Sequence, residues 1–197
     1  MQLSIVGGGV FLGAAALRSA LAGGHRVTVF SRGRSCSVWP ARVEVLTGDR
    51  SADLSPLDPR GSTTWDTVID TCAGVSGDVP ADVPADMRAS ARVPGGCGSF
   101  LFVSSVPACA TTSRVQVPET DALASAAGIA PDDLDPEHCG PQKVACEAEV
   151  QAAFCDRGLI VRPGLIAGPG DHSGHFSQWP WRVTAGGETR VPMWPTT

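Results

Sequence analysis

The sequence predicts an α/β protein with a doubly wound parallel sheet. Short apolar runs alternate with helical patterns along the chain, and a glycine-rich turn follows the first of these runs. Strands that alternate with helices favour a parallel sheet covered on both faces and joined by right-handed crossovers. The 197 residues, 43% of them hydrophobic, can bury a core of their own, so wholesale disorder is excluded.

The first expected element is a strand over residues 2–6, which runs directly into three glycines. A helix is expected over residues 10–22, because apolar residues from Val10 to Leu21 recur at spacings of four, three and four. Two glycines follow this helix and end it.

Apolar runs indicate five further strands, over residues 25–30, 42–46, 67–71, 99–103 and 159–161. A long helix is expected over residues 141–154, where Cys146, Val150 and Phe154 are four apart. Residues 74–98 are rich in Pro, Ala, Gly and Asp, and they predict a weak helix with a loop.

The charge and cysteine content exclude several classes of protein. A net charge of −5 and a pI near 5.3 disfavour nucleic-acid binding, which needs a positive face. No apolar stretch is long enough to span a membrane, and glycines interrupt the first apolar run, unlike a secretory signal. The seven cysteines contain no C-x-x-C pair, so we expect reduced thiols, no metal site and a cytoplasmic location.

The glycine-rich turn is the first functional signal. It has the pattern Gly7-x-x-Val10-x-x-Gly13 between a strand and a helix, where the free N–H groups and the dipole of the helix favour a dinucleotide pyrophosphate. The alternative is a tight turn with no ligand. The predicted cofactor contacts in this turn are Gly7, Gly9, Val10, Phe11, Leu12 and Gly13.

The end of the second strand indicates which dinucleotide binds. An acidic residue there would select NAD, but the sequence has Ser31 and Arg32. The fork of donors on arginine suits a 2′-phosphate, so we predict NADP, with NAD as the alternative cofactor. If Arg32 and Arg34 are only solvated surface residues, this preference disappears.

Several segments together make a specific resemblance. They are Gly-Gly-Gly-Val-Phe-Leu-Gly at 7–13, Gly48-Asp49, Asp70-Thr71-Cys72-Ala73, Phe102-Val103-Ser104-Ser105, Val161-Arg162-Pro163-Gly164 and Gly168-Pro169. With these segments the chain resembles the extended short-chain dehydrogenase/reductase superfamily, in its NAD-dependent epimerase/dehydratase branch of actinobacterial type. The resemblance implies a Rossmann-like cofactor domain over residues 1–166. It also implies a reduced C-terminal lobe over residues 167–197 that binds a small-molecule substrate, often a nucleotide sugar.

The resemblance also assigns site residues. It places the catalytic serine at Ser105 and the lysine of the family's Tyr-x-x-x-Lys at Lys143. It places further cofactor contacts at Asp49, Arg50, Cys72, Ala73, Lys143, Pro163 and Leu165. Dimers formed through the long helices are common in that family, and the helix over residues 141–154 is available for a homodimer.

The catalytic tyrosine is missing. Its position falls on Cys139, another frequent family tyrosine falls on Cys109, and the chain contains no tyrosine at all. Lys143 lies one helical turn after Cys139 and could acidify its thiol, but a thiol is much shorter than a phenol. His138 is a poor replacement, because adjacent helical residues point in different directions.

Three hypotheses follow from this substitution. The chain is an enzyme of the family type in which Ser105, Cys139 and Lys143 have altered roles, or it is a cofactor- or ligand-binding protein that has lost redox chemistry. Otherwise it is a scaffold reused for a non-redox cyclisation or isomerisation. In the C-terminal segment, Trp179 and Trp181 would face the same side of an extended strand, where they either line a pocket or lie exposed.

Overall fold

The computed structural model describes residues 1–34, 38–57, 64–71, 84–92, 96–111, 116–130, 133, 135–171, 173–174 and 176–188. The sheet has six strands: β1 (Gln2–Val6), β2 (Arg26–Ser31), β3 (Val43–Thr47), β4 (Trp65–Asp70), β5 (Cys97–Val103) and β6 (Gly158–Val161). The described α-helices are α1 (Phe11–Ala22), α2 (Pro84–Ala91), α3 (Cys139–Phe154) and α4 (Gln178–Ala185).

The six strands form one parallel sheet in the order β3-β2-β1-β4-β5-β6. This is a Rossmann-like sheet, and it confirms the predicted fold class. The strand order reverses between β1 and β4, where Val6 pairs with Asp70. In sheets of this kind, ligands bind in the crevice outside the carboxyl ends of the strands at that reversal.

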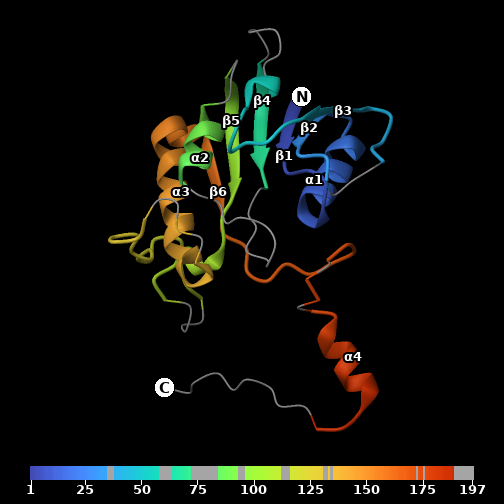
Figure 1. Cartoon of the computed structure of the whole chain (residues 1–197), viewed down its shortest axis with the longest axis vertical. Helices are drawn as coiled ribbons and strands as arrows, with labels where there is room; N and C mark the ends of the chain where they lie inside the picture. Colours follow the sequence, from blue (N-terminus) through green and yellow to red (C-terminus); the bar gives the residue numbers. More distant parts are fainter. Residues whose placement is uncertain are drawn as a thin grey trace.

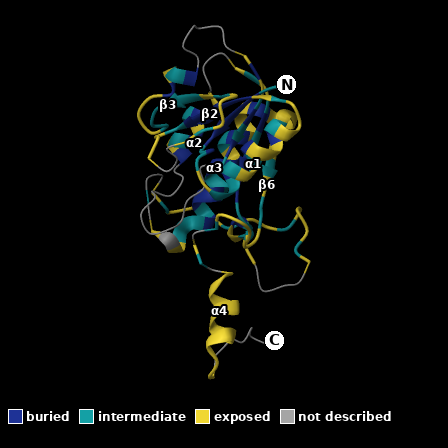
Figure 2. Cartoon of the chain, turned by 90° about the vertical axis from the view of Figure 1, so that its right-hand side faces the viewer, coloured by how far each residue is buried: buried dark blue, intermediate teal, exposed yellow. Residues whose placement is uncertain are grey.

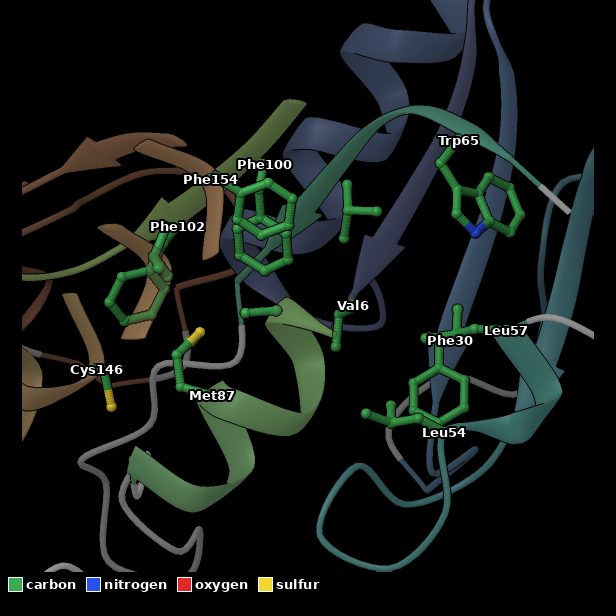
Figure 3. Close-up of a cluster of buried hydrophobic side chains, with 13 residues drawn as sticks. Val6, Phe30, Leu54, Leu57, Trp65, Met87, Phe100, Phe102, Cys146 and Phe154 are labelled. Carbon is green, nitrogen blue, oxygen red and sulfur yellow. The ribbon is translucent and has the colours of Figure 1, made fainter. Parts of the chain in front are cut away.

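Helices cover the two faces of the sheet unequally (Figure 1). On one face, α1 packs on β1 and β2 through a small core of Leu3, Ile5, Leu17, Ala20, Val27 and Val29. On the other face, α2 and α3 cover a larger core that includes Val6, Val68, Met87, Phe100, Phe102 and Phe154. Figure 3 shows this larger core, in which Phe100 and Phe154 stack with their ring centroids 5.0 Å apart.

Every predicted strand is present, with ends that differ by no more than two residues from those expected. The predicted weak helix is α2, which begins at Pro84 and ends at Ala91. Helix α3 begins at Cys139, two residues earlier than expected. Pro141 therefore lies inside its first turn, where the N–H that proline lacks has no helical acceptor in any case.

The structure contradicts the extended conformation predicted for the C-terminal tryptophans but shows both of them exposed, which was one of the two expected outcomes. Trp179 and Trp181 lie in helix α4 instead of an extended segment, and residues two apart on a helix point about 200° from each other. Helix α4 stands away from the sheet and has no buried residue (Figure 2).

Candidate functional site

The glycine turn lies at the reversal of strand order, where β1 runs into α1. Gly7 has a φ of +89°, which suits glycine, and its N–H donates to the carbonyl of Phe30 over 3.0 Å. A Cβ on Gly13 would lie 2.3 Å from the carbonyl oxygen of Gly7. The start of α1 therefore packs directly on the turn, and any side chain at position 13 would force the two apart.

The first turn of α1 offers uncapped N–H groups. An α-helix leaves its first N–H groups without helical acceptors, and here Val10 makes no side-chain cap and no acidic residue follows. The residues present therefore fit a diphosphate, which would accept from these groups and favour the positive end of the helix dipole. The structure places the six residues predicted for this role, positions 7 and 9–13, in or directly after the turn.

The ends of β2 and β3 meet beside this turn. The N–H of Gly48 donates to the carbonyl of Ser31 over 3.1 Å, so Asp49 lies next to the end of β2. The pKa of Asp49 lies below its ordinary value, chiefly because Ser51 donates to the carboxylate and also because Arg32 and Arg34 are nearby cations. The structure thus brings together Ser31, Arg32 and Asp49, three of the predicted cofactor contacts.

Arg50, another predicted cofactor contact, has its guanidinium at the end of β4. Its Nη1 lies 3.1 Å from both carboxylate oxygens of Asp70, which is fully buried. Removing one partner of such a buried pair typically costs about 3–5 kcal/mol. The contact holds the loop after β3 at the carboxyl end of β4, beside the crevice. Cys72 and Ala73, the next predicted contacts, lie outside the described residues.

The predicted catalytic residues converge at the carboxyl end of β5. Ser105 follows β5 and precedes the short 3₁₀ turn Val106–Ala108. A Cβ on Gly140 would lie 2.2 Å from the carbonyl oxygen of Pro107, so the start of α3 packs tightly against this turn. Cys139 directly precedes that contact, and both Cys139 and Ser105 are half-buried.

Lys143 is buried on α3, one helical turn after Cys139. Its Nζ donates to the carbonyl of Val103 over 3.3 Å and lies 4.9 Å from the centre of the Phe102 ring. The lysine charge is therefore held two residues before Ser105, at the end of β5. The one-turn spacing of Cys139 and Lys143 is that expected from the sequence.

The segment after β6 closes this end of the site. The N–H of Val106 donates to the carbonyl of Pro163 over 3.0 Å, so the predicted contact at Pro163 lies beside the segment that carries Ser105. Leu165 is 69% exposed. Cys109 pairs with Leu123 in an isolated antiparallel bridge two residues after Pro107.

His138 does not take the place of the missing phenol in this geometry. It precedes α3, and its Nδ1 lies 2.9 Å from Oδ2 of Asp133. Gln142, one turn further along, donates to the carbonyls of Ala130 and Asp133. Both side chains therefore face the segment before α3, whereas Lys143 faces the end of β5.

Sequence reasoning missed Glu147. This carboxylate is 3% exposed and lies one turn after Lys143 on α3. A charged residue at i+4 from the predicted catalytic lysine, between apolar positions 146 and 150, was the signal that could have found it. Within the described ranges, no group of three His, Cys, Asp or Glu residues is placed to hold a metal ion. No described helix is long and apolar enough to cross a membrane.

Comparison with known proteins gives a fold relationship. The WbmG enzyme of Bordetella bronchiseptica, in complex with NAD and UDP, matches with a TM-score of 0.69 at 19% identity, over 95% of this chain and 60% of its own. The UDP-glucuronic acid 4-epimerase of Bacillus cereus, in complex with NAD, matches with a TM-score of 0.59 at 16% identity, over 86% of this chain and 58% of its own. MoeE5, in complex with UDP-glucose and NAD, matches with a TM-score of 0.61 at 16% identity, over 89% of this chain and 58% of its own.

The chain is structurally similar to NAD-dependent epimerase/dehydratase enzymes. It spans about three fifths of the length of these solved structures. No protein-family model and no curated protein matches the sequence. At identities below one in five the likeness concerns the fold, and the chemistry has to be argued from the residues of this chain.

Proposed function

We propose that the chain binds a nicotinamide dinucleotide at the reversal of strand order and acts on a nucleotide sugar or a related small molecule. The observation that carries this proposal is the contact of Gly13 with Gly7, which leaves the N-terminus of α1 open to a diphosphate. Structures with the same fold contain NAD together with UDP or UDP-glucose, which supports both ligand classes.

The cofactor would lie across the carboxyl ends of the strands. Its diphosphate would meet the glycine turn, and its adenosine would meet Ser31, Arg32 and Asp49. The other half would then extend toward the ends of β5 and β6. When bound, a nicotinamide supplies a site that gives or accepts a hydride.

The residues of this chain would orient the substrate and move a proton. Ser105 offers a hydroxyl at the end of β5, and Lys143 holds a buried cation one helical turn from Cys139. A cation within reach of a thiol favours the thiolate, and the one-turn spacing of Lys143 from Cys139 makes Cys139 the candidate proton carrier. A thiol reaches less far than a phenol. We therefore expect weak proton transfer with substrates that suit a tyrosine.

The cofactor preference proposed here is NADP. Arg32 and Arg34 lie near Asp49, and no acidic residue occupies positions 31–34 at the end of β2. NAD is the alternative, and structures with the same fold have been solved with it.

A second candidate function is dinucleotide binding without turnover. The absence of tyrosine from the whole chain, with Cys139 in the position that the resemblance assigns to it, favours this candidate. General acid–base help by such a group is typically worth about 10²–10⁴ in rate, so its loss could leave a binding protein.

Calorimetry with NAD, NADH, NADP and NADPH, followed by incubation with UDP-sugars, tests the proposal. Saturable binding with turnover supports the enzyme, and tight binding without turnover supports the binding protein. Folded protein that binds none of the four dinucleotides at millimolar concentration would refute both.

The proposed substrate lobe begins after residue 166. Its described part includes α4, which has no buried residue and stands apart from the sheet (Figure 2). A segment that makes so few contacts with the cofactor domain is available to meet a substrate or a second copy of the chain. A homodimer through α3 stays a prediction.

A further inference from the structure

A buried network of charged and polar groups joins α3 to the ends of two strands. Glu147 on α3 accepts from Nε of Arg162 over 2.9 Å and from Nη2 over 2.6 Å, and the Ser104 hydroxyl donates to the same carboxylate. Ser104 directly follows β5, and Arg162 directly follows β6. The network therefore fixes three elements relative to one another at a single carboxylate.

Stability alone is a weak reason for such a network. Removing two charges from water costs free energy that their attraction often fails to recover, so apolar residues of similar volume would serve as well or better. A bidentate arginine–carboxylate pair does set geometry, because the planar fork accepts only one relative orientation. The arrangement thus favours a role in positioning.

Each member of the network adjoins a residue of the candidate site. Glu147 lies one helical turn after Lys143, Ser104 precedes Ser105, and Arg162 precedes Pro163. Backbone contacts continue the connection, because the N–H of Ser104 donates to the carbonyl of Val161 over 2.8 Å. A shift of Glu147 would therefore be transmitted to all three neighbours.

We propose that Glu147 is a positioning residue that holds Lys143, Ser105 and the segment after β6 around the nicotinamide half of the bound dinucleotide. The inference rests on the proposed function, in which the adenosine half lies at the ends of β2 and β3. Glu147 acts through its neighbours, so its loss should affect one half of the cofactor and leave the other half alone.

The test compares two ligands that differ only in the nicotinamide end. Calorimetry would measure the reduced dinucleotide that wild type prefers, NADH or NADPH, and the matching fragment without nicotinamide, ADP-ribose or its 2′-phosphate. We expect Glu147→Gln to weaken dinucleotide binding by about tenfold, which corresponds to about 1.4 kcal/mol. The affinity for the fragment should change by less than about twofold, because its adenosine contacts lie at the ends of β2 and β3 and share no partner with Glu147.

The chain offers a matched control on the same helix. Glu149 also pairs with an arginine, Arg88, but this pair lies at the surface, and the Arg88 side chain is 55% exposed. Glu149→Gln removes the same charge two residues away and should change neither affinity. A selective loss in Glu147→Gln alone supports the proposal.

Two further variants test the proposal if Glu147→Gln fails to fold. Ser104→Ala removes only a hydroxyl, and Glu147→Gln combined with Arg162→Gln leaves no unpaired buried charge. Both variants should lose affinity for the dinucleotide and keep their affinity for the fragment, and the loss should be smaller in Ser104→Ala.

Equal losses for dinucleotide and fragment, or no loss in any folded variant, would overturn the positioning role while the proposed function stands. If wild type binds the fragment but gains nothing from the nicotinamide half, the positioning role is likewise overturned. If wild type binds neither ligand, the proposed function fails and the positioning role fails with it.

Discussion

The two ends of the crevice differ in which atoms form the site, backbone at one end and side chains at the other. At the end of β1, where the diphosphate would lie, the site consists of backbone: a turn that needs glycine at positions 7 and 13 and a helix N-terminus without a cap. At the ends of β5 and β6, it consists of side chains, with Lys143 and Glu147 buried. The backbone end depends on the absence of side chains. The side-chain end depends on the placement of single atoms.

This difference would allow one half of such a site to change while the other half is kept. A backbone site persists as long as its glycines persist, since the N–H groups are supplied by the fold. At the side-chain end, if Cys139 stands in the role of a tyrosine, α3 and its contacts stay in place while the reach of the acid group is shorter. Changes to the acid group at the side-chain end should therefore affect rate, and changes at the backbone end should affect binding.

Restoring the phenol should have the largest effect. We expect Cys139→Tyr to raise the rate of hydride transfer by about 10²–10⁴, the usual contribution of a positioned acid–base group. The absorbance of the reduced nicotinamide would follow the reaction with UDP-sugars. Cys139→Ser, which removes the thiol without adding a phenol, should not raise the rate. An unchanged rate in Cys139→Tyr would mean that the resemblance has been aligned wrongly over α3.

Adding a side chain at Gly13 of the glycine turn should abolish most dinucleotide binding. The Cβ of Gly13→Ala would lie 2.3 Å from the Gly7 carbonyl, so α1 has to move away from the turn. We expect dinucleotide affinity to fall by at least about tenfold, which needs only about 1.4 kcal/mol.

A matched control separates this effect from general instability. Gly98→Ala also creates a collision, with its Cβ 2.8 Å from the carbonyl of Asp66, but at the opposite end of the sheet. Gly98→Ala should lower the free energy of unfolding in urea and leave the affinity of the folded protein unchanged. Equal affinities for the two variants would contradict a site at the glycine turn.

Removing the cation beside Asp49 should have a smaller and more selective effect. We expect Arg32→Ala to weaken NADP binding by about tenfold, because a charge-assisted pair with the 2′-phosphate is lost, and to leave NAD binding nearly unchanged. Arg34→Ala, which removes a neighbouring exposed cation, is the control and should have less effect. A wild type that binds both cofactors equally would rule out this role for Arg32.

The surface pair between Arg88 on α2 and Glu149 on α3 should have the smallest effect and a definite pH dependence. The pKa of Glu149 lies below its ordinary value of 4.5, chiefly because Arg88 donates to its carboxylate. A lowered pKa means that the pair stabilises the native state at neutral pH and loses this contribution as the pH falls through the lowered value. The difference in unfolding free energy between wild type and Glu149→Gln should therefore shrink toward zero in acid. A difference that grows in acid would contradict this pairing.

Most of the fold was predictable because its signals are local. Apolar runs that alternate with helical spacing indicated all six strands and the parallel sheet, and the glycine turn indicated where α1 begins. The start of α3 was predicted two residues late, at Pro141, and α4 was not predicted. Proline is common at the first helical position, but it is tolerated throughout the first turn, where the N–H that it lacks has no helical acceptor.

The sequence by itself determined the parallel α/β fold and the glycine turn, because each depends on residue type at a short spacing. Only the tertiary structure decided that Arg50 turns to Asp70 and that Glu147 joins Ser104 to Arg162. These partners are between 15 and 43 residues apart. No local pattern encodes such contacts, because they exist only when the ends of different strands are brought to one edge of the sheet.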